Sequence, residues 1–221
     1  MKKILTTLLL SLGLSTFSQA ALIANGDFQT CDLTGWQRDT DGNGDPGATA
    51  DFSVLNNGGQ CAAQIRVDDG SSASAFFANS LFQELDLSAA VGDILTLSFD
   101  WDFAGTDGDP WFGDYFSVFL SNASGDPYGA DGTLGYLLDP SSEYGTGQLS
   151  VMLDASLYNQ TGWTLNFVLE DALSPTQDIL FSTLNIDNAS ISVASSSVDA
   201  PATLSLSLLA LLLFARRKFA L

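Results

Sequence analysis

The sequence predicts an all-β protein built as an antiparallel β-sandwich. Apolar and polar residues alternate along many short segments, which is the period of a strand with one buried face. Turns rich in Gly, Asp, Asn and Pro separate these segments, and no sustained helical stripe occurs between the two ends of the chain. Because 46% of the 221 residues are apolar, the chain can build a core, and its acidity does not indicate disorder.

The strands are predicted from this alternation. In chain order they are residues 22–29, 52–55, 62–67, 75–87, 94–103, 115–121, 134–138, 149–153, 163–169 and 178–193. Segment 94–103 is the clearest, because Leu95, Leu97, Phe99, Trp101 and Phe103 share one face while Asp100 and Asp102 lie on the other. Turns are predicted at 42–47, 56–59, 105–110 and 124–132. Trp36, Trp101 and Trp163 are expected in the core.

The charge distribution excludes several classes of function. Between residues 21 and 200, only Arg38 and Arg66 stand against 26 acidic residues, a net charge of 2 − 26 = −24. Binding of nucleic acid requires a basic patch, which this body lacks. The chain has no histidine, which excludes a Ser-His-Asp or Cys-His centre and any metal site built on imidazole. No nucleophile elbow or phosphate-binding loop is present, so a non-catalytic protein is predicted.

Both ends of the chain have sequence patterns that are typical of targeting segments. Lys2 and Lys3, the apolar run 4–14 and the small-residue stretch ending at Ala20 form a secretory signal over residues 1–20. At the other end, a helix over 202–215 would be about 21 Å long, shorter than a hydrocarbon core of about 30 Å. Its basic end would stay in the cytoplasm, which predicts transient insertion into the inner membrane before processing. A permanent membrane tail is the alternative.

The C-terminal segment resembles the PEP-CTERM sorting signal of Gram-negative bacteria over residues 198–221. The motif residues are Asp199, Ala200 and Pro201, followed by the apolar stretch and by Arg216, Arg217 and Lys218. Asp199-Ala200-Pro201 stands where that family has Pro-Glu-Pro. The resemblance implies recognition by an exosortase-type processing enzyme and delivery to the cell surface or an exopolysaccharide matrix. The domain between the two signals then covers residues 21–197.

A second resemblance concerns that domain. Asn25-Gly26-Asp27-Phe28-Gln29 with Gly35-Trp36, and the segments 81–85, 95–101 and 184–189, are similar to jelly-roll carbohydrate-binding modules and galactose-binding-like sandwiches. The resemblance implies a jelly roll over residues 22–193. It also implies a structural calcium ion between the first and last strands, at Asp27, Gln29 and Asp187, although the family usually has Glu where Gln29 stands. The alternative is that these side chains close turns.

A second calcium loop is predicted at Asp39, Asp41, Asn43 and Asp45, because oxygen ligands alternate there as in the start of an EF-type loop. The twelfth position is Ala50, which cannot supply the bidentate carboxylate of such a loop. An acidic solvated loop is the alternative.

Cys31 and Cys61 are predicted to form a disulfide, since two cysteines in an exported domain usually pair.

Glycan sites combine exposed aromatic faces with side chains that hydrogen-bond hydroxyls. Asp100, Asp102, Trp111, Tyr115 and Phe119 are predicted to line one concave sheet for this purpose. The sequence therefore predicts an exported, non-catalytic cell-surface or matrix protein that associates with extracellular polysaccharide. Two alternatives stay open: a structural or adhesive protein acting through calcium-bridged contacts, and a carbohydrate-active hydrolase with a pair of carboxylates.

Overall fold

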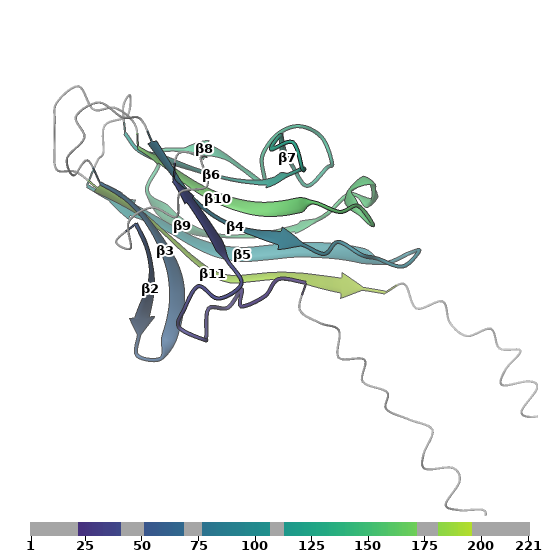
Figure 1. Ribbon diagram of the computed structural model, residues 1–221, viewed down its shortest axis with the longest axis horizontal. Coiled ribbons are helices and arrows are strands. Elements are labelled where there is room, and N and C mark those ends of the chain that lie inside the picture. The colour runs from purple at the N-terminus through teal and green to yellow at the C-terminus, as the bar shows by residue number, and fades with distance from the viewer. Residues whose placement is uncertain (1–21, 41–50, 69–76, 107–112, 172–180, 196–221) are drawn as a thin grey trace, which may run out of the picture.

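Two antiparallel sheets pack face to face in the computed structural model (Figure 1), which describes residues 22–40, 51–68, 77–106, 113–171 and 181–195. The only helical element in these ranges is a 3-10 turn, Ala155–Leu157. The predicted all-β sandwich is therefore confirmed. No helix among the described residues is long and apolar enough to cross a membrane.

The strands divide into a six-stranded and a five-stranded sheet. The first has the order β1 (Gln37–Thr40), β4 (Phe77–Leu85), β10 (Trp163–Asp171), β6 (Tyr115–Ser121) and β7 (Pro127–Tyr128), with β8 (Leu138–Ser141) also paired to β6. The second has the order β2 (Phe52–Asn57), β3 (Gln60–Asp68), β11 (Phe181–Ala194), β5 (Ile94–Gly105) and β9 (Gly145–Met152). The last strand of the described residues, β11, thus lies in the middle of the five-stranded sheet.

Aromatic residues from the two inner faces meet in the core. The Phe99 ring of β5 lies edge-on to Phe167 of β10, with centroids 5.0 Å apart, and Trp101 of β5 contacts Phe116 of β6 at 4.9 Å. Trp36 and Trp163 are buried, as the sequence predicts, whereas Trp101 is half-buried and packs against the core. Each large ring removes apolar surface from water, which is the main force that holds the two sheets together.

The strand predictions fail at two segments. Residues 22–29 form turns rather than a strand, because Asn25 and Phe28 have positive φ angles of 48° and 49°, which an extended chain does not adopt. In 134–138, Leu134 forms only an isolated bridge to Tyr128, and β8 begins at Leu138. Strand β1 was not expected from the alternation, since it contains no apolar residue.

The loop before β1 is fastened to the five-stranded sheet at two points. The predicted disulfide is confirmed: Cys31 is bonded to Cys61 at the start of β3, with Cα atoms 5.3 Å apart. Beside it, Gly26 lies against β11, where an added Cβ would lie 1.8 Å from the carbonyl oxygen of Ala189. Only glycine permits that approach, so the sequence holds this loop against the last strand.

The targeting segments lie outside the described residues. This applies to the signal segment 1–20 and to the sorting residues Asp199, Ala200, Pro201, Arg216, Arg217 and Lys218. Their roles stay predictions from the sequence.

Removal of the disulfide is expected to destabilise the domain. The bridge closes a loop with a sequence separation of 30, so replacing both Cys31 and Cys61 with Ala should lower the free energy of unfolding by about 2–4 kcal/mol. Urea denaturation measures the change. Reduction of the unmutated protein is the matched control, since it opens the same loop without altering side-chain volume, and an unchanged midpoint in both experiments would contradict this role.

Candidate functional site

A groove of about 220 Å³ lies on the outer face of the five-stranded sheet. Its lining residues come from β2, β3, β5 and β11, and they are Leu55, Asn57, Ala62, Asp100, Trp101, Asp102, Asn185, Ile186 and Asp187. Strand alternation explains the arrangement. Because Phe99 and Phe103 of β5 point into the core, the intervening Asp100 and Asp102 point outward.

The strand register places the polar residues of the groove side by side. Asp187 of β11 is paired with Asp100 of β5, and Asn185 is paired with Asp102. On the other side of β11, Asn185 is paired with Gln64 of β3. Directly paired residues have neighbouring side chains on the same face of a sheet. The register therefore brings three carboxylates and two amides together from three strands.

A chain of hydrogen bonds crosses four strands and ends on Asp102. The Ser53 hydroxyl donates to Oε1 of Gln64 at 3.3 Å, and Nε2 of Gln64 donates to Oδ1 of Asn185 at 2.9 Å. Nδ2 of Asn185 then donates to Oδ2 of Asp102 at 3.1 Å. Every donor in this chain points toward the carboxylate, which fixes the orientation of Asp102 before any ligand arrives.

Asp100 is held by amides on both of its oxygens. Nε2 of Gln148, on β9, donates to Oδ1 at 2.8 Å, and Nδ2 of Asn188 donates to Oδ2 at 2.7 Å. Two amide donors on opposite oxygens restrict the rotation of the carboxylate. Asp100 is thus held in one orientation among the residues that line the groove.

A β-bulge in β11 brings Asn188 to this position. The register shifts between Asp187 and Ser190, which leaves one extra residue on β11. Asn188 has a φ of 55°, a left-handed conformation that Asn tolerates better than most residues. The N–H of Ala189 donates to the carbonyl oxygen of Gly26 at 2.8 Å. The bulge therefore redirects Asn188 toward Asp100 and pairs the leftover backbone group with the loop before β1.

Asp187 lies in an unfavourable electrostatic environment. Burial raises the pKa of its carboxyl above the ordinary value of 3.8, and the negative charges of Asp100 and Asp27 raise the pKa further. The backbone N–H of Asn188, which donates to Oδ1 at 2.7 Å, acts in the opposite direction. The groove thus concentrates negative charge that the fold only partly compensates.

The prediction that Asp100, Asp102, Tyr115 and Phe119 line one sheet is wrong. The two acids lie on the five-stranded sheet, whereas Tyr115 and Phe119 belong to β6 of the six-stranded sheet. Alternation along a strand determines which residues share its face, but it does not determine which sheet the strand joins. Trp111 lies outside the described residues.

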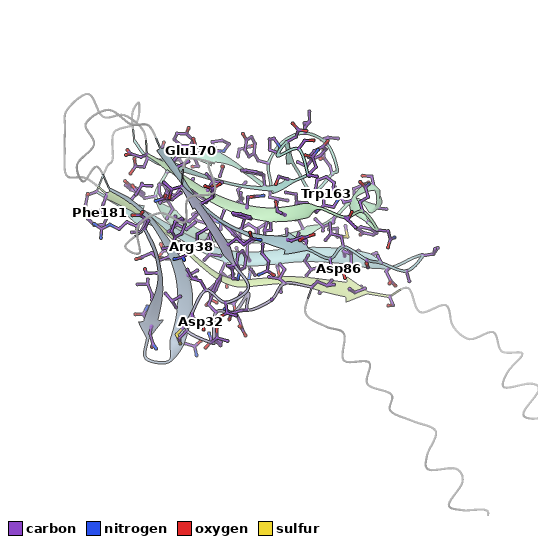
Figure 2. The ribbon with its side chains drawn as sticks, viewed as in Figure 1. Asp32, Arg38, Asp86, Trp163, Glu170 and Phe181 are labelled. Carbon is purple, nitrogen blue, oxygen red and sulfur yellow. A yellow bond between two sulfur atoms is a disulfide. The ribbon has the colours of Figure 1, made fainter. Side chains whose placement is uncertain are left out.

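Tyr115 and Phe119 have partners on the outer face of the six-stranded sheet. The Tyr115 hydroxyl donates to Oε2 of Glu170 at 2.5 Å (Glu170 is labelled in Figure 2), and burial together with Glu170 raises the pKa of Tyr115 above its usual range. The Phe119 ring lies edge-on to Tyr136, with centroids 5.7 Å apart. These two residues therefore form a surface separate from the groove.

The calcium predictions are only partly covered by the described residues. Asp27 lies close enough to affect Asp187 electrostatically, but Nε2 of Gln29 turns back to donate to the carbonyl oxygen of Asp27 at 3.0 Å. Asp39 lies on β1, while Asp41, Asn43 and Asp45 lie outside the described residues. In the ranges that the structure describes, no group of three or more His, Cys, Asp or Glu side chains is arranged to hold a metal ion. Calcium binding stays a prediction.

The side-chain amides that orient the groove acids were not predicted from the sequence. Gln64, Gln148, Asn185 and Asn188 all contribute hydrogen bonds to the network. A signal for two of them exists in Asn185-Ile186-Asp187-Asn188, where polar side chains occupy the outer positions of a central strand. The partners of these residues come from strands distant in sequence, which a single strand pattern does not show.

No protein-family model matches the sequence, and no curated protein matches it. Similar solved structures include a Family 16 carbohydrate-binding module, with 17% identity and a TM-score of 0.45, which covers 77% of this chain and 99% of that one. A module described as specific for non-crystalline cellulose has 12% identity and a TM-score of 0.42, covering 78% and 95%. A Stig cyclase from Fischerella sp. TAU has 17% identity and a TM-score of 0.46, covering 81% and 99%.

The chain also resembles parts of larger proteins. It spans 21% of the enzymatically active domain of tailspike protein 4 from bacteriophage CBA120 and 26% of an arabinose-bound α-L-arabinofuranosidase. Their TM-scores are both 0.45, with identities of 11% and 15%. These similarities assign no family, so a proposal of function rests on the groove itself.

The raised pKa of Asp187 predicts the effect of neutralising it. Its charged form is disfavoured in the folded state, so the charge costs stability above the folded-state pKa, and this cost disappears as the pH falls toward the ordinary value of 3.8. In buffer without divalent ions, Asp187→Asn should raise the melting temperature at pH 7 by up to about 2–4 °C, a limit set by solvent screening.

The gain should vanish near pH 4. The matched control is Asp139→Asn, which removes the same charge from an exposed position on β8. An equal gain in both variants would show that overall charge, rather than the environment of Asp187, determines the effect.

Proposed function

We propose that the protein binds extracellular polysaccharide without catalysis, through the groove on its five-stranded sheet. The observation that carries this proposal is the row of oriented polar side chains Asp102, Asn185 and Gln64, together with Asp100, on an outward-facing sheet. Carboxylates and amides hydrogen-bond sugar hydroxyls well, and oriented groups lose little entropy when a ligand binds.

The dimensions of the groove suit one stretch of a long polymer. At about 220 Å³, it is smaller than the pockets of about 300–1,000 Å³ that enclose drug-sized molecules. Leu55 and Ala62 form an apolar side on which the C–H groups of a sugar ring can pack. Such a shallow site with polar and apolar sides fits a ligand that continues past it in both directions.

Hydrolysis of a polysaccharide is the competing proposal, because Asp187 and Asp100 are two neighbouring acids and the pKa of Asp187 is raised. In a glycosidase, one carboxylate acts as nucleophile or base. Both oxygens of Asp100 already accept hydrogen bonds from the amides of Gln148 and Asn188, which hold the carboxylate in place. This arrangement favours a binding role for Asp100 over a catalytic one.

Export and sorting complete the proposal. A signal segment at 1–20 and a PEP-CTERM-like tail at 198–221 would deliver the domain to the cell surface or matrix of a Gram-negative bacterium, with an exosortase-type enzyme as processing partner. A polysaccharide matrix is the environment in which a glycan-binding groove has a ligand.

Binding is tested by affinity electrophoresis of the exported protein in gels that contain the producing organism's exopolysaccharide. The polymer should retard the unmutated protein, and Asp102→Asn should weaken binding about tenfold or more, because a hydrogen bond to a charged group contributes about 1.5–3 kcal/mol. Asp139→Asn on the other sheet is the control and should bind normally. Absence of retardation, or release of reducing sugar from the polymer, would contradict the proposal.

A structural role for calcium is a second proposal, which the charge around Asp187 favours. A divalent ion near Asp187 would relieve its repulsion by Asp100 and Asp27, and binding to the folded state alone would stabilise it. Millimolar calcium should therefore raise the melting temperature of the unmutated protein, chelator should reverse the change, and Asp187→Ala should abolish it. A melting temperature that changes with neither calcium nor chelator would contradict the structural role of calcium.

A further inference from the structure

We propose that the groove selects polysaccharides with free amino groups, glycans that contain 2-amino-2-deoxy sugars, over neutral and uronic-acid polymers. This inference rests on the proposed polysaccharide binding and names its ligand class. It follows from the charges that line the cavity and from the direction of the hydrogen bonds around it.

The groove holds three carboxylates, Asp100, Asp102 and Asp187, and none of its lining residues among the described ranges is a lysine or an arginine. The described part of the chain contains two cations, and both contact aromatic rings elsewhere. The guanidinium of Arg66 lies 4.6 Å from the ring centroid of Phe181, and that of Arg38 lies 6.0 Å from that of Phe52. Figure 2 shows Phe181 near the left end of the coloured ribbon, at the start of β11. A cation supplied by a ligand would therefore meet uncompensated acids.

Among the described residues, one oxygen of Asp102 and one oxygen of Asp187 accept no hydrogen bond. Asn185 donates to Oδ2 of Asp102, and Asn188 donates through its backbone to Oδ1 of Asp187. In the described ranges, these are the hydrogen bonds that the two carboxylates accept, so Oδ1 of Asp102 and Oδ2 of Asp187 remain available. An ammonium group has three donors and no acceptor, and it therefore matches such a surface better than a hydroxyl does.

Charge also discriminates among polymers. A uronate would bring a further negative charge beside three carboxylates, and like charges repel one another. A neutral sugar can donate hydroxyl hydrogen bonds but leaves the three charges uncompensated. An ammonium both donates to the carboxylates and compensates their charge, whereas a hydroxyl only donates.

The test is calorimetric titration of the full exported chain with three oligosaccharides of equal length at physiological salt. They are a β-1,4-linked glucosamine oligomer, its fully N-acetylated counterpart and an oligogalacturonate. The buffer contains no calcium, because an ion at Asp187 would compensate one of the groove acids, and its pH lies below the pKa of the glucosamine amine, so that the amine is an ammonium. The glucosamine oligomer should bind at least tenfold more tightly than the acetylated one, and the oligogalacturonate should bind most weakly. Spermine, an amine without a sugar, should bind more weakly than the glucosamine oligomer.

A matched pair of variants separates the groove from the overall charge. Asp100→Asn/Asp102→Asn/Asp187→Asn removes three acids from the groove. Glu84→Gln/Asp139→Asn/Glu143→Gln removes three exposed acids outside it, on β4, on β8 and just before β9. The first variant should lose the preference for the glucosamine oligomer and the second should keep it. If the groove variant does not fold, Asp102→Asn alone should reduce the preference at least threefold.

Four results would overturn the inference, and they differ in whether they also contradict the proposed polysaccharide binding. The two triple variants could lose the preference for the glucosamine oligomer equally, or spermine could bind as tightly as that oligomer. Either result would mean that the net charge alone attracts amines. Equal or tighter binding of the acetylated oligomer would remove the amine preference but keep polysaccharide binding. Failure of the producing organism's exopolysaccharide and all three oligomers to bind would overturn both the inference and the proposed function.

Discussion

The pairing of β11 with β5 is the constraint on which the groove depends. This pairing places β11 at the centre of the five-stranded sheet, between β3 and β5. It brings Asn185 opposite Asp102 and Asp187 opposite Asp100. A slip of one residue would turn these side chains into the core. The buried positions Leu184 and Ile186 prevent such a slip, since it would expose them to water.

The bulge in β11 connects that pairing to the rest of the molecule. The extra residue interrupts the ladder after Asp187, and the freed N–H of Ala189 bonds to Gly26 in the loop before β1. The disulfide from Cys31 to Cys61 fastens the same loop to β3. The orientation of Asn188 therefore depends on the loop before β1 as well as on the bulge. A change at Gly26 would reach Asp100 through the backbone of β11 rather than through any direct contact.

The sequence predicts the sheets better than it predicts the site. Alternation in β5 correctly places Phe99 and Phe103 inside and Asp100 and Asp102 outside, because burial of apolar side chains on one face is a local property of a strand. The two cysteines also identify a contact between the N-terminal loop and β3. The grouping of Asp100 with Phe119 fails, because strand order is a non-local property that no single segment records. The turns at 22–29 fail for a different reason, since Phe28 is buried by a left-handed turn rather than by a strand face.

The central claim is that polysaccharide binds on the five-stranded sheet, and nuclear magnetic resonance tests it most directly. Oligosaccharide prepared from the producing organism's exopolysaccharide would be titrated into the isotope-labelled protein. The side-chain amide signals of Asn185, Asn188 and Gln148 should shift, because their N–H groups orient the groove carboxylates. Shifts confined to the six-stranded sheet, around Tyr115 and Phe119, or no shifts at all, would contradict the account.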